Sequence, residues 1–109
     1  MAGFAEMPSP PYFAVIFSSQ RRDPDPAYDE MAAALDALAR EQPGFLGRES
    51  ARGADGFGVS VSYFSSEAAI AAWRAQGDHF AAQRLGKERW YDEYRVRVAK
   101  VERAYGGPR

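Results

Sequence analysis

Residues 45–64 read FLGRESARGADGFGVSVSYF, two strand-like segments on either side of a glycine-rich turn. Asp55-Gly56 supplies the positive φ that a tight hairpin turn requires. Phe45 to Arg52 and Phe57 to Phe64 flank the turn and have the composition of strands, so we expect an antiparallel hairpin. The second strand has a bulky face and a small polar face, because side chains alternate along a strand. The bulky face holds Phe57, Val59, Val61 and Tyr63, and the small face holds Gly58, Ser60 and Ser62.

A helix is expected before the hairpin, from Pro26 to about Gln42. Asp25 suits the N-cap, Pro26 suits the first helical position, and Pro43-Gly44 ends the helix. Its apolar residues recur at spacings of three and four, as in an amphipathic helix: Ala27, Met31, Leu35 and Leu38. The preceding segment, Tyr12 to Ser18, is apolar on both faces, which predicts a central strand covered on both sides.

After the hairpin, Ser65 or Ser66 can cap a helix that runs to about Gln76. Gly77 is expected to end it, and Asp78 to cap a second short helix through Leu85. Trp90 to Val101 alternates as a long last strand. The resulting order, β-α-β-β-α-α-β, predicts an α+β fold of the ferredoxin-like class, with an antiparallel sheet and helices on one face.

The length of 109 residues predicts one domain, which we place at residues 12–105. Residues 1–11 hold three prolines and are expected to form an extended lead-in, and residues 106–109 a tail. The net charge of −1 argues against a nucleic-acid partner, and the absence of cysteine excludes thiolate metal sites and cysteine nucleophiles. No apolar run approaches the ~20 residues of a membrane span, so we expect a cytoplasmic protein without a membrane partner.

Helices on one face of a sheet leave its other face bare in a monomer. Phe13, Val15, Phe17 and the alternate residues of the other strands cannot all be hidden by the helices. A second copy of the chain is the simplest cover for such an apolar patch. The sequence therefore predicts a homodimer.

From Tyr12 to Tyr105 the chain resembles the antibiotic biosynthesis monooxygenase family of dimeric α+β barrels. The matching segments are QPGFLG at 42–47, ESA at 49–51, and YFSSE at 63–67 leading to Trp73 and His79-Phe80. The resemblance implies the fold. It implies less about activity, because the family includes cofactor-independent oxygenases of aromatic polyketides, quinol oxygenases and haem-degrading enzymes.

The haem-degrading branch, as the resemblance implies, uses an Asn on the first strand, a Trp on the helix after the hairpin, and a His ten residues beyond that Trp. Only the Trp is matched here, at Trp73. The position ten residues on is Gln83, and His79 lies six residues on. Haem binding and degradation is therefore the least favoured interpretation.

Several side chains are candidates for chemistry, each with a plainer structural alternative. His79, the only histidine, would be a general base, or a partly buried polar residue of its helix. Arg95 and Arg97 share a face of the last strand and would hold an oxyanion, or pair with acids such as Glu49. The candidate substrate-binding residues also suit core packing or the edge of the sheet, and they are Trp73, Tyr63, Phe17, Ser60 and Ser62. Further candidates are Arg52, Arg84, Tyr91 and Tyr94.

No metal site is expected, since one histidine cannot build a histidine cluster, and GADGFG at 53–58 joins two strands and so is no phosphate loop. The favoured hypothesis is a cofactor-independent monooxygenase-like enzyme acting on a small electron-rich aromatic such as a quinol or anthrone. The rival hypothesis is a non-catalytic module of the same fold that binds a small ligand or a partner.

Overall fold

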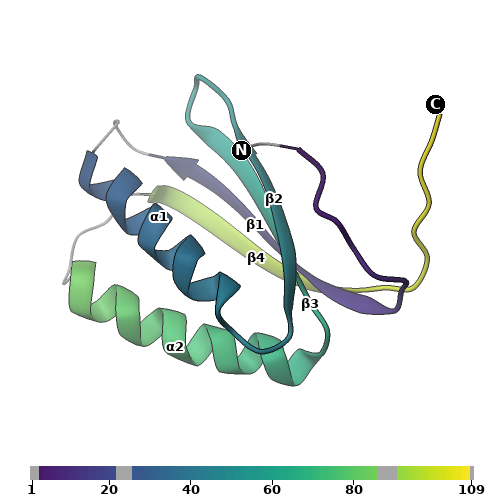
Figure 1. Cartoon of the computed structure of the whole chain (residues 1–109). Coiled ribbons are helices and arrows are strands. Elements are labelled where there is room, and N and C mark those ends of the chain that lie inside the picture. The colour runs from purple at the N-terminus through teal and green to yellow at the C-terminus, as the bar shows by residue number, and fades with distance from the viewer. Residues whose placement is uncertain (1–2, 22–25, 86–90, 109) are drawn as a thin grey trace.

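The computed structural model describes residues 3–21, 26–85 and 91–108, and the side chains of residues 26–28, 78–85 and 91–92 also lie outside that description. The elements are β1 (Tyr12–Arg21), α1 (Pro26–Arg40), β2 (Phe45–Arg52), β3 (Phe57–Phe64), α2 (Glu67–Leu85) and β4 (Tyr91–Val101). Two layers result, a four-stranded sheet and a pair of helices lying side by side on one of its faces (Figure 1). The ferredoxin-like α+β class is confirmed, with the order β-α-β-β-α-β.

All strand pairs are antiparallel, and the order across the sheet is β2-β3-β1-β4. β1 is central, as its two-sided apolar pattern predicted, and continues three residues past the expected end at Ser18. The hairpin has the predicted bounds. Gly56 has a φ of +92°, and its neighbour Asp55 accepts a hydrogen bond from the Phe57 N–H through Oδ1 at 3.0 Å. The turn chemistry of Asp-Gly thus sets the register of β2 on β3.

The expected break at Gly77 is wrong, because α2 runs unbroken from Glu67 to Leu85. Glycine weakens a helix by about 1 kcal/mol but does not stop one when packing supports it. A Cβ at Gly77 would lie 3.6 Å from the Trp73 ring, so the glycine provides a flat surface beside the indole. The predicted cap is confirmed at the start of the helix, where Ser66 Oγ accepts from the Ala69 N–H at 3.0 Å.

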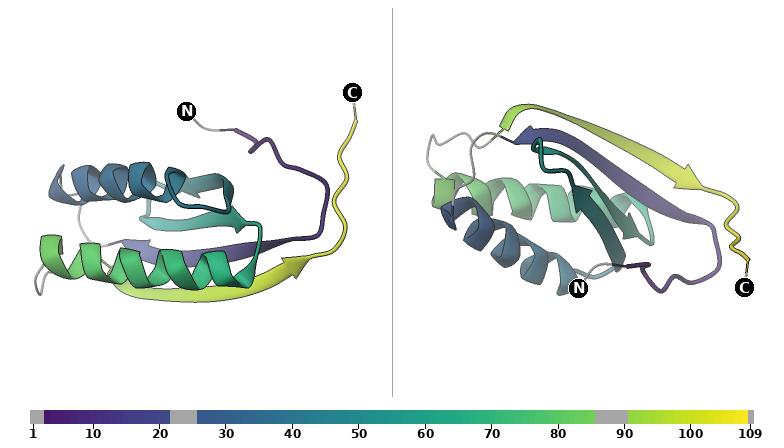
Figure 2. Two further views of the ribbon diagram at one scale, coloured as in Figure 1. Left: turned by 60° about the horizontal axis from the view of Figure 1, so that its bottom comes forward. Right: turned by 90° about the horizontal axis from the view of Figure 1, so that it is seen from above.

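Cross-strand pairing defines two sides of the sheet. Arg48 of β2 contacts Asp36 of α1, so the side that carries Arg48 faces the helices; we call it the helix side. It holds Phe13, Val15 and Phe17 of β1, Gly58, Ser60 and Ser62 of β3, Arg48, Ser50 and Arg52 of β2, and Tyr94, Val96 and Val98 of β4. The other side, which we call the open side, holds the alternate residues. Figure 2 shows the helix layer clear of the open side.

The expectation for β1 is therefore corrected in detail. Phe13, Val15 and Phe17 face the helices and are half-buried, whereas Tyr12, Ala14 and Ile16 face the open side. Part of the open side is crossed by residues 3–7, which lie over β2. Ala5 N–H donates to Glu49 Oε2 at 2.9 Å. Gly47 permits this approach, because a Cβ there would stand 2.9 Å from the Ala5 Cβ. The lead-in is thus docked to the open side.

Two further expectations concern residues outside the described part: the Asp25 cap and the Trp90 start of the last strand. Within the described part, no helix is long and apolar enough to cross a membrane.

Candidate functional site

The helix side of the sheet brings together small and aromatic side chains. Phe17 pairs with Ser60 across the β1–β3 ladder, and Val15 with Ser62. The Phe17 ring stacks on Tyr94 of β4, with 5.5 Å between the ring centroids and 29° between the planes. Ser60 and Ser62 leave a low surface beside this aromatic pair, since residues opposite each other in a ladder have Cβ atoms about 5 Å apart.

Two arginines of β2 border the same serines. Arg52 is held within the fold, since its guanidinium donates to Ser19 Oγ at 2.8 Å and to the backbone oxygens of Ser19 and Gly56. Arg48 donates to Ser60 Oγ at 3.4 Å and to Asp36 Oδ1 at 3.3 Å. Its Nε is buried and has no hydrogen-bond partner among the described residues. Arg48 therefore retains an unused donor on the helix side.

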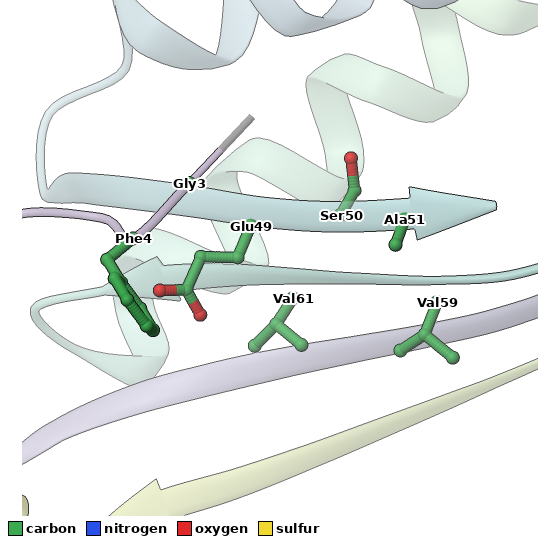
Figure 3. A pocket seen from close by; sticks show the side chains of 7 residues that line it. All are labelled: Gly3, Phe4, Glu49, Ser50, Ala51, Val59 and Val61. Atoms are coloured by element: carbon green, nitrogen blue, oxygen red, sulfur yellow. The ribbon is translucent and has the colours of Figure 1, made fainter. Parts of the chain in front are cut away.

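The open side has a different site. A pocket of about 340 Å³ opens there between the docked lead-in and the sheet (Figure 3). In Figure 3 Glu49, Val59 and Val61 point toward this pocket, and Ser50 points to the opposite side of the sheet. The Glu49 carboxylate accepts from the Tyr63 hydroxyl at 2.9 Å and from the Ala5 N–H. Burial raises the pKa of Tyr63 to about 12, helped by the hydrogen bond to Glu49 and its charge. The complete lining is Gly3, Phe4, Glu49, Ser50, Ala51, Val59 and Val61.

The register separates the candidates named from the sequence into two groups. Phe17, Ser60 and Ser62 lie together on the helix side, whereas Tyr63, Arg95 and Arg97 lie on the open side. Arg95 is exposed and forms an ion pair with Glu93 two residues away on the same strand. Within one chain these two groups therefore do not form one site.

The remaining candidates lie on or beyond α2. Trp73 is half-buried on the stripe that also contains Ile70 and Gly77. His79 lies in α2, but its side chain is outside the described residues, as are those of Arg84 and Tyr91. Among the described residues, no group of three or more His, Cys, Asp or Glu side chains can hold a metal ion.

Sequence reasoning missed Arg48. The signal was present, because Arg48, Ser50 and Arg52 alternate along a strand whose turn fixes its partner. The hairpin register then sets Arg48 opposite Ser62 and Ser50 opposite Ser60. What the sequence did not contain was the side of the sheet that the helices cover.

The protein is of the ferredoxin-like α+β class. Small, aromatic and basic residues line the helix side of its sheet. The model of the antibiotic biosynthesis monooxygenase family matches residues 11–85. The chain belongs to that family.

Similar proteins agree with this assignment. The uncharacterized protein YqjZ of Bacillus subtilis (strain 168) is 52% identical over 99 residues, which are 91% of this chain and 87% of the relative. The solved structure of a point mutant of SnoaB, a cofactor-independent oxygenase from Streptomyces nogalater, has a TM-score of 0.70 at 12% identity and covers 85% of this chain and 95% of its own. A dimeric ferredoxin-like protein from Jannaschia sp. CCS1 has a TM-score of 0.58 at 20% identity, covering 82% and 99%.

Proposed function

We propose that this chain is a cofactor-independent monooxygenase acting on a small electron-rich aromatic of the quinol or anthrone type. The stacked Phe17–Tyr94 pair beside Ser60 and Ser62 carries the proposal, because a flat ring can lie on the serines with its edge against the aromatic pair. Family membership supports it, as does the fold shared with a protein described as a cofactor-independent oxygenase.

The proposed chemistry needs no electron donor besides the substrate. Removal of a proton gives an enolate or phenolate, which transfers electrons to O₂. One oxygen atom enters the substrate and the other leaves as water, so that an anthrone methylene becomes a carbonyl at the expense of one O₂. The protein must supply a base, a group that stabilises the oxyanion, and a dry apolar surface.

His79 is the proposed base, because histidine is the side chain that ordinarily exchanges a proton near neutral pH. It lies in α2, which packs beside β3 and so borders the helix side. Trp73 of the same helix is the proposed wall of the site, together with Phe17, Ser60 and Ser62. Arg95, Arg97 and Tyr63 face the open side and lie outside this location.

The test is oxygen consumption by the purified protein with a panel of quinols and anthrones, each compared with its spontaneous oxidation. We expect turnover above this background and a loss of at least about a hundredfold in kcat for His79→Ala, the usual range for a general base. The His79→Gln variant controls for side-chain volume. Unchanged turnover in His79→Ala would remove the assignment of the base. Ligand binding without any oxygen consumption would favour the non-catalytic binding module.

We further propose that the chain works as a homodimer through the open side of the sheet. Phe57 and Val59 are exposed there, and Phe4 of the docked lead-in is 94% exposed. β2 and β4 are edge strands whose outer backbone groups have no partner strand in the sheet of the described chain. A related fold is described as dimeric.

A further inference from the structure

We propose that the Arg48 guanidinium binds an ionised oxygen of a fused aromatic ligand that lies across β3 on the helix side of the sheet. The inference deepens the proposed function and rests on it for the location of the ligand. It adds the class of ligand, an aromatic phenolate, enolate or carboxylate, and the residue that recognises its charge.

The register of the hairpin places a basic strand and an aromatic strand on either side of small side chains. Arg48 of β2 pairs with Ser62 of β3, which pairs with Val15 of β1. One step along, Ser50 pairs with Ser60, which pairs with Phe17. Neighbouring strands are about 4.8 Å apart, so β2 and β1 are separated by about 10 Å. The Arg48 side chain extends over β3, where its Nη2 lies 3.4 Å from Ser60 Oγ, so a fused aromatic ligand beside Phe17 has its charged edge at the guanidinium.

The charge around Arg48 is only partly balanced. Asp36 Oδ1 lies 3.3 Å from Arg48 Nη1, and Asp36 Oδ2 lies 3.0 Å from Arg40 Nε. Among the described residues, one carboxylate therefore serves two guanidinium groups, and this group of three side chains has an excess of one positive charge. A ligand anion restores the balance.

The hydrogen bonding of Arg48 is also incomplete. Its side chain is 29% exposed, yet its Nε–H is buried and has no acceptor in the part of the chain that the structure describes. The bonds that its Nη1 and Nη2 atoms make to Asp36 and Ser60 are long, 3.3 and 3.4 Å, so the exposed part of the guanidinium can still donate to a ligand oxygen. Arg52, on the same strand and side, differs because Ser19 and Gly56 already accept its hydrogen bonds. The difference selects Arg48 as the ligand-binding arginine of β2.

The test measures binding, so that it is independent of turnover. The probes are 2-naphthoate and its neutral isostere 2-naphthamide, titrated calorimetrically into the wild-type protein and into Arg48→Met. We expect the wild type to prefer 2-naphthoate by about tenfold, the effect of about one charge-assisted hydrogen bond. Arg48→Met removes this preference and leaves the affinity for 2-naphthamide within about twofold. Arg48→Lys, which keeps the charge without the guanidinium fork, retains part of it.

Two other arginines sharpen the comparison. Arg40→Met removes the second guanidinium from Asp36, and its preference for 2-naphthoate stays within about threefold of the wild type. Arg97→Met alters the open side and also leaves the preference unchanged. If Arg97→Met abolishes the preference and Arg48→Met does not, the anion binds on the open side and the proposal is overturned.

The remaining outcomes are equally decisive. Equal affinity of the wild type for both probes, or failure to bind either one, overturns the proposal. If circular dichroism shows that Arg48→Met is unfolded, the preference for 2-naphthoate is compared between Arg48→Lys and Arg40→Met instead. The proposal requires the preference to be smaller in Arg48→Lys than in Arg40→Met. Oxygen consumption by a protein without anion preference overturns this inference alone. Anion preference at Arg48 without oxygen consumption overturns the proposed oxygenase activity alone.

Discussion

The Tyr63 hydroxyl donates to Glu49 Oε1 at 2.9 Å, and the other oxygen of the same carboxylate accepts from the Ala5 N–H at 2.9 Å. One carboxylate thus joins β2, β3 and the N-terminal lead-in on the open side. Tyr63 also packs edge-on against Tyr12 of the central strand, with 5.6 Å between ring centroids. This cluster joins the β2–β3 hairpin to the N-terminal lead-in and to the central strand.

Stability is expected to fall at high pH because Tyr63 must stay protonated to donate this bond. Desolvation and the neighbouring Glu49 raise its pKa from 10.0 to about 12. The contribution is complete below pH 10, where unfolded tyrosine is protonated, and is lost as the pH rises toward 12. The loss is on the order of 1 kcal/mol, because Tyr63 is partly exposed and solvent screens part of the interaction. Urea unfolding of the wild type and Tyr63→Phe from pH 8.5 to 12 measures it as the difference between the two curves. Parallel curves over that range would contradict it.

The lead-in is expected to lift from the sheet when Gly47 gains a side chain. Its Cβ would lie 2.9 Å from the Ala5 Cβ, closer than side chains tolerate. Gly47→Ala therefore weakens the Ala5–Glu49 hydrogen bond and lowers the free energy of unfolding by about 1 kcal/mol. Hydrogen exchange at the Ala5 amide measures the detachment. Gly106→Ala is the matched control, since a Cβ there meets no atom within 4 Å. Unchanged protection of Ala5 in Gly47→Ala would show that the lead-in accommodates the methyl group.

The homodimer is expected to depend on the open side. Val59 lies there and is 36% exposed, whereas Val98 lies on the helix side of β4 and is 52% exposed. Val59→Asp buries an unpaired carboxylate in the proposed interface, which raises the dimer dissociation constant at least about a hundredfold. Val98→Asp leaves it within about threefold. Sedimentation velocity over a range of concentrations makes the measurement. Dissociation by Val98→Asp instead would place the interface on the other side of the sheet.

Hemin is expected not to bind specifically. The residue ten positions beyond Trp73 is Gln83 rather than a histidine, and β1 contains no asparagine. A hemin titration should therefore give no saturable Soret shift. A saturable shift that His79→Ala abolishes would refute this expectation and identify His79 as an axial ligand.

Short local sequence signals predict most of the secondary structure. The Asp55-Gly56 turn, the Pro43-Gly44 stop and the Ser66 cap act within a few residues of themselves, so their consequences follow from the sequence. The break expected at Gly77 is wrong because one glycine weakens a helix by only about 1 kcal/mol. There the contact between Trp73 and the glycine surface supports the continuous helix.

The α+β class, the antiparallel hairpin and the alternation of residues along each strand follow from the sequence. The side of the sheet that the helices cover, and hence which of the two alternating sets they contact, depends on long-range packing. That choice put Arg48 with Phe17, Ser60 and Ser62, and placed Arg95, Arg97 and Tyr63 on the opposite side. Side chains alternate along a strand with a period of two, so the pattern is the same for both faces of the sheet and does not indicate which face the helices cover. The symmetry is broken by contacts between distant segments, such as Arg48 with Asp36 and Glu49 with Ala5.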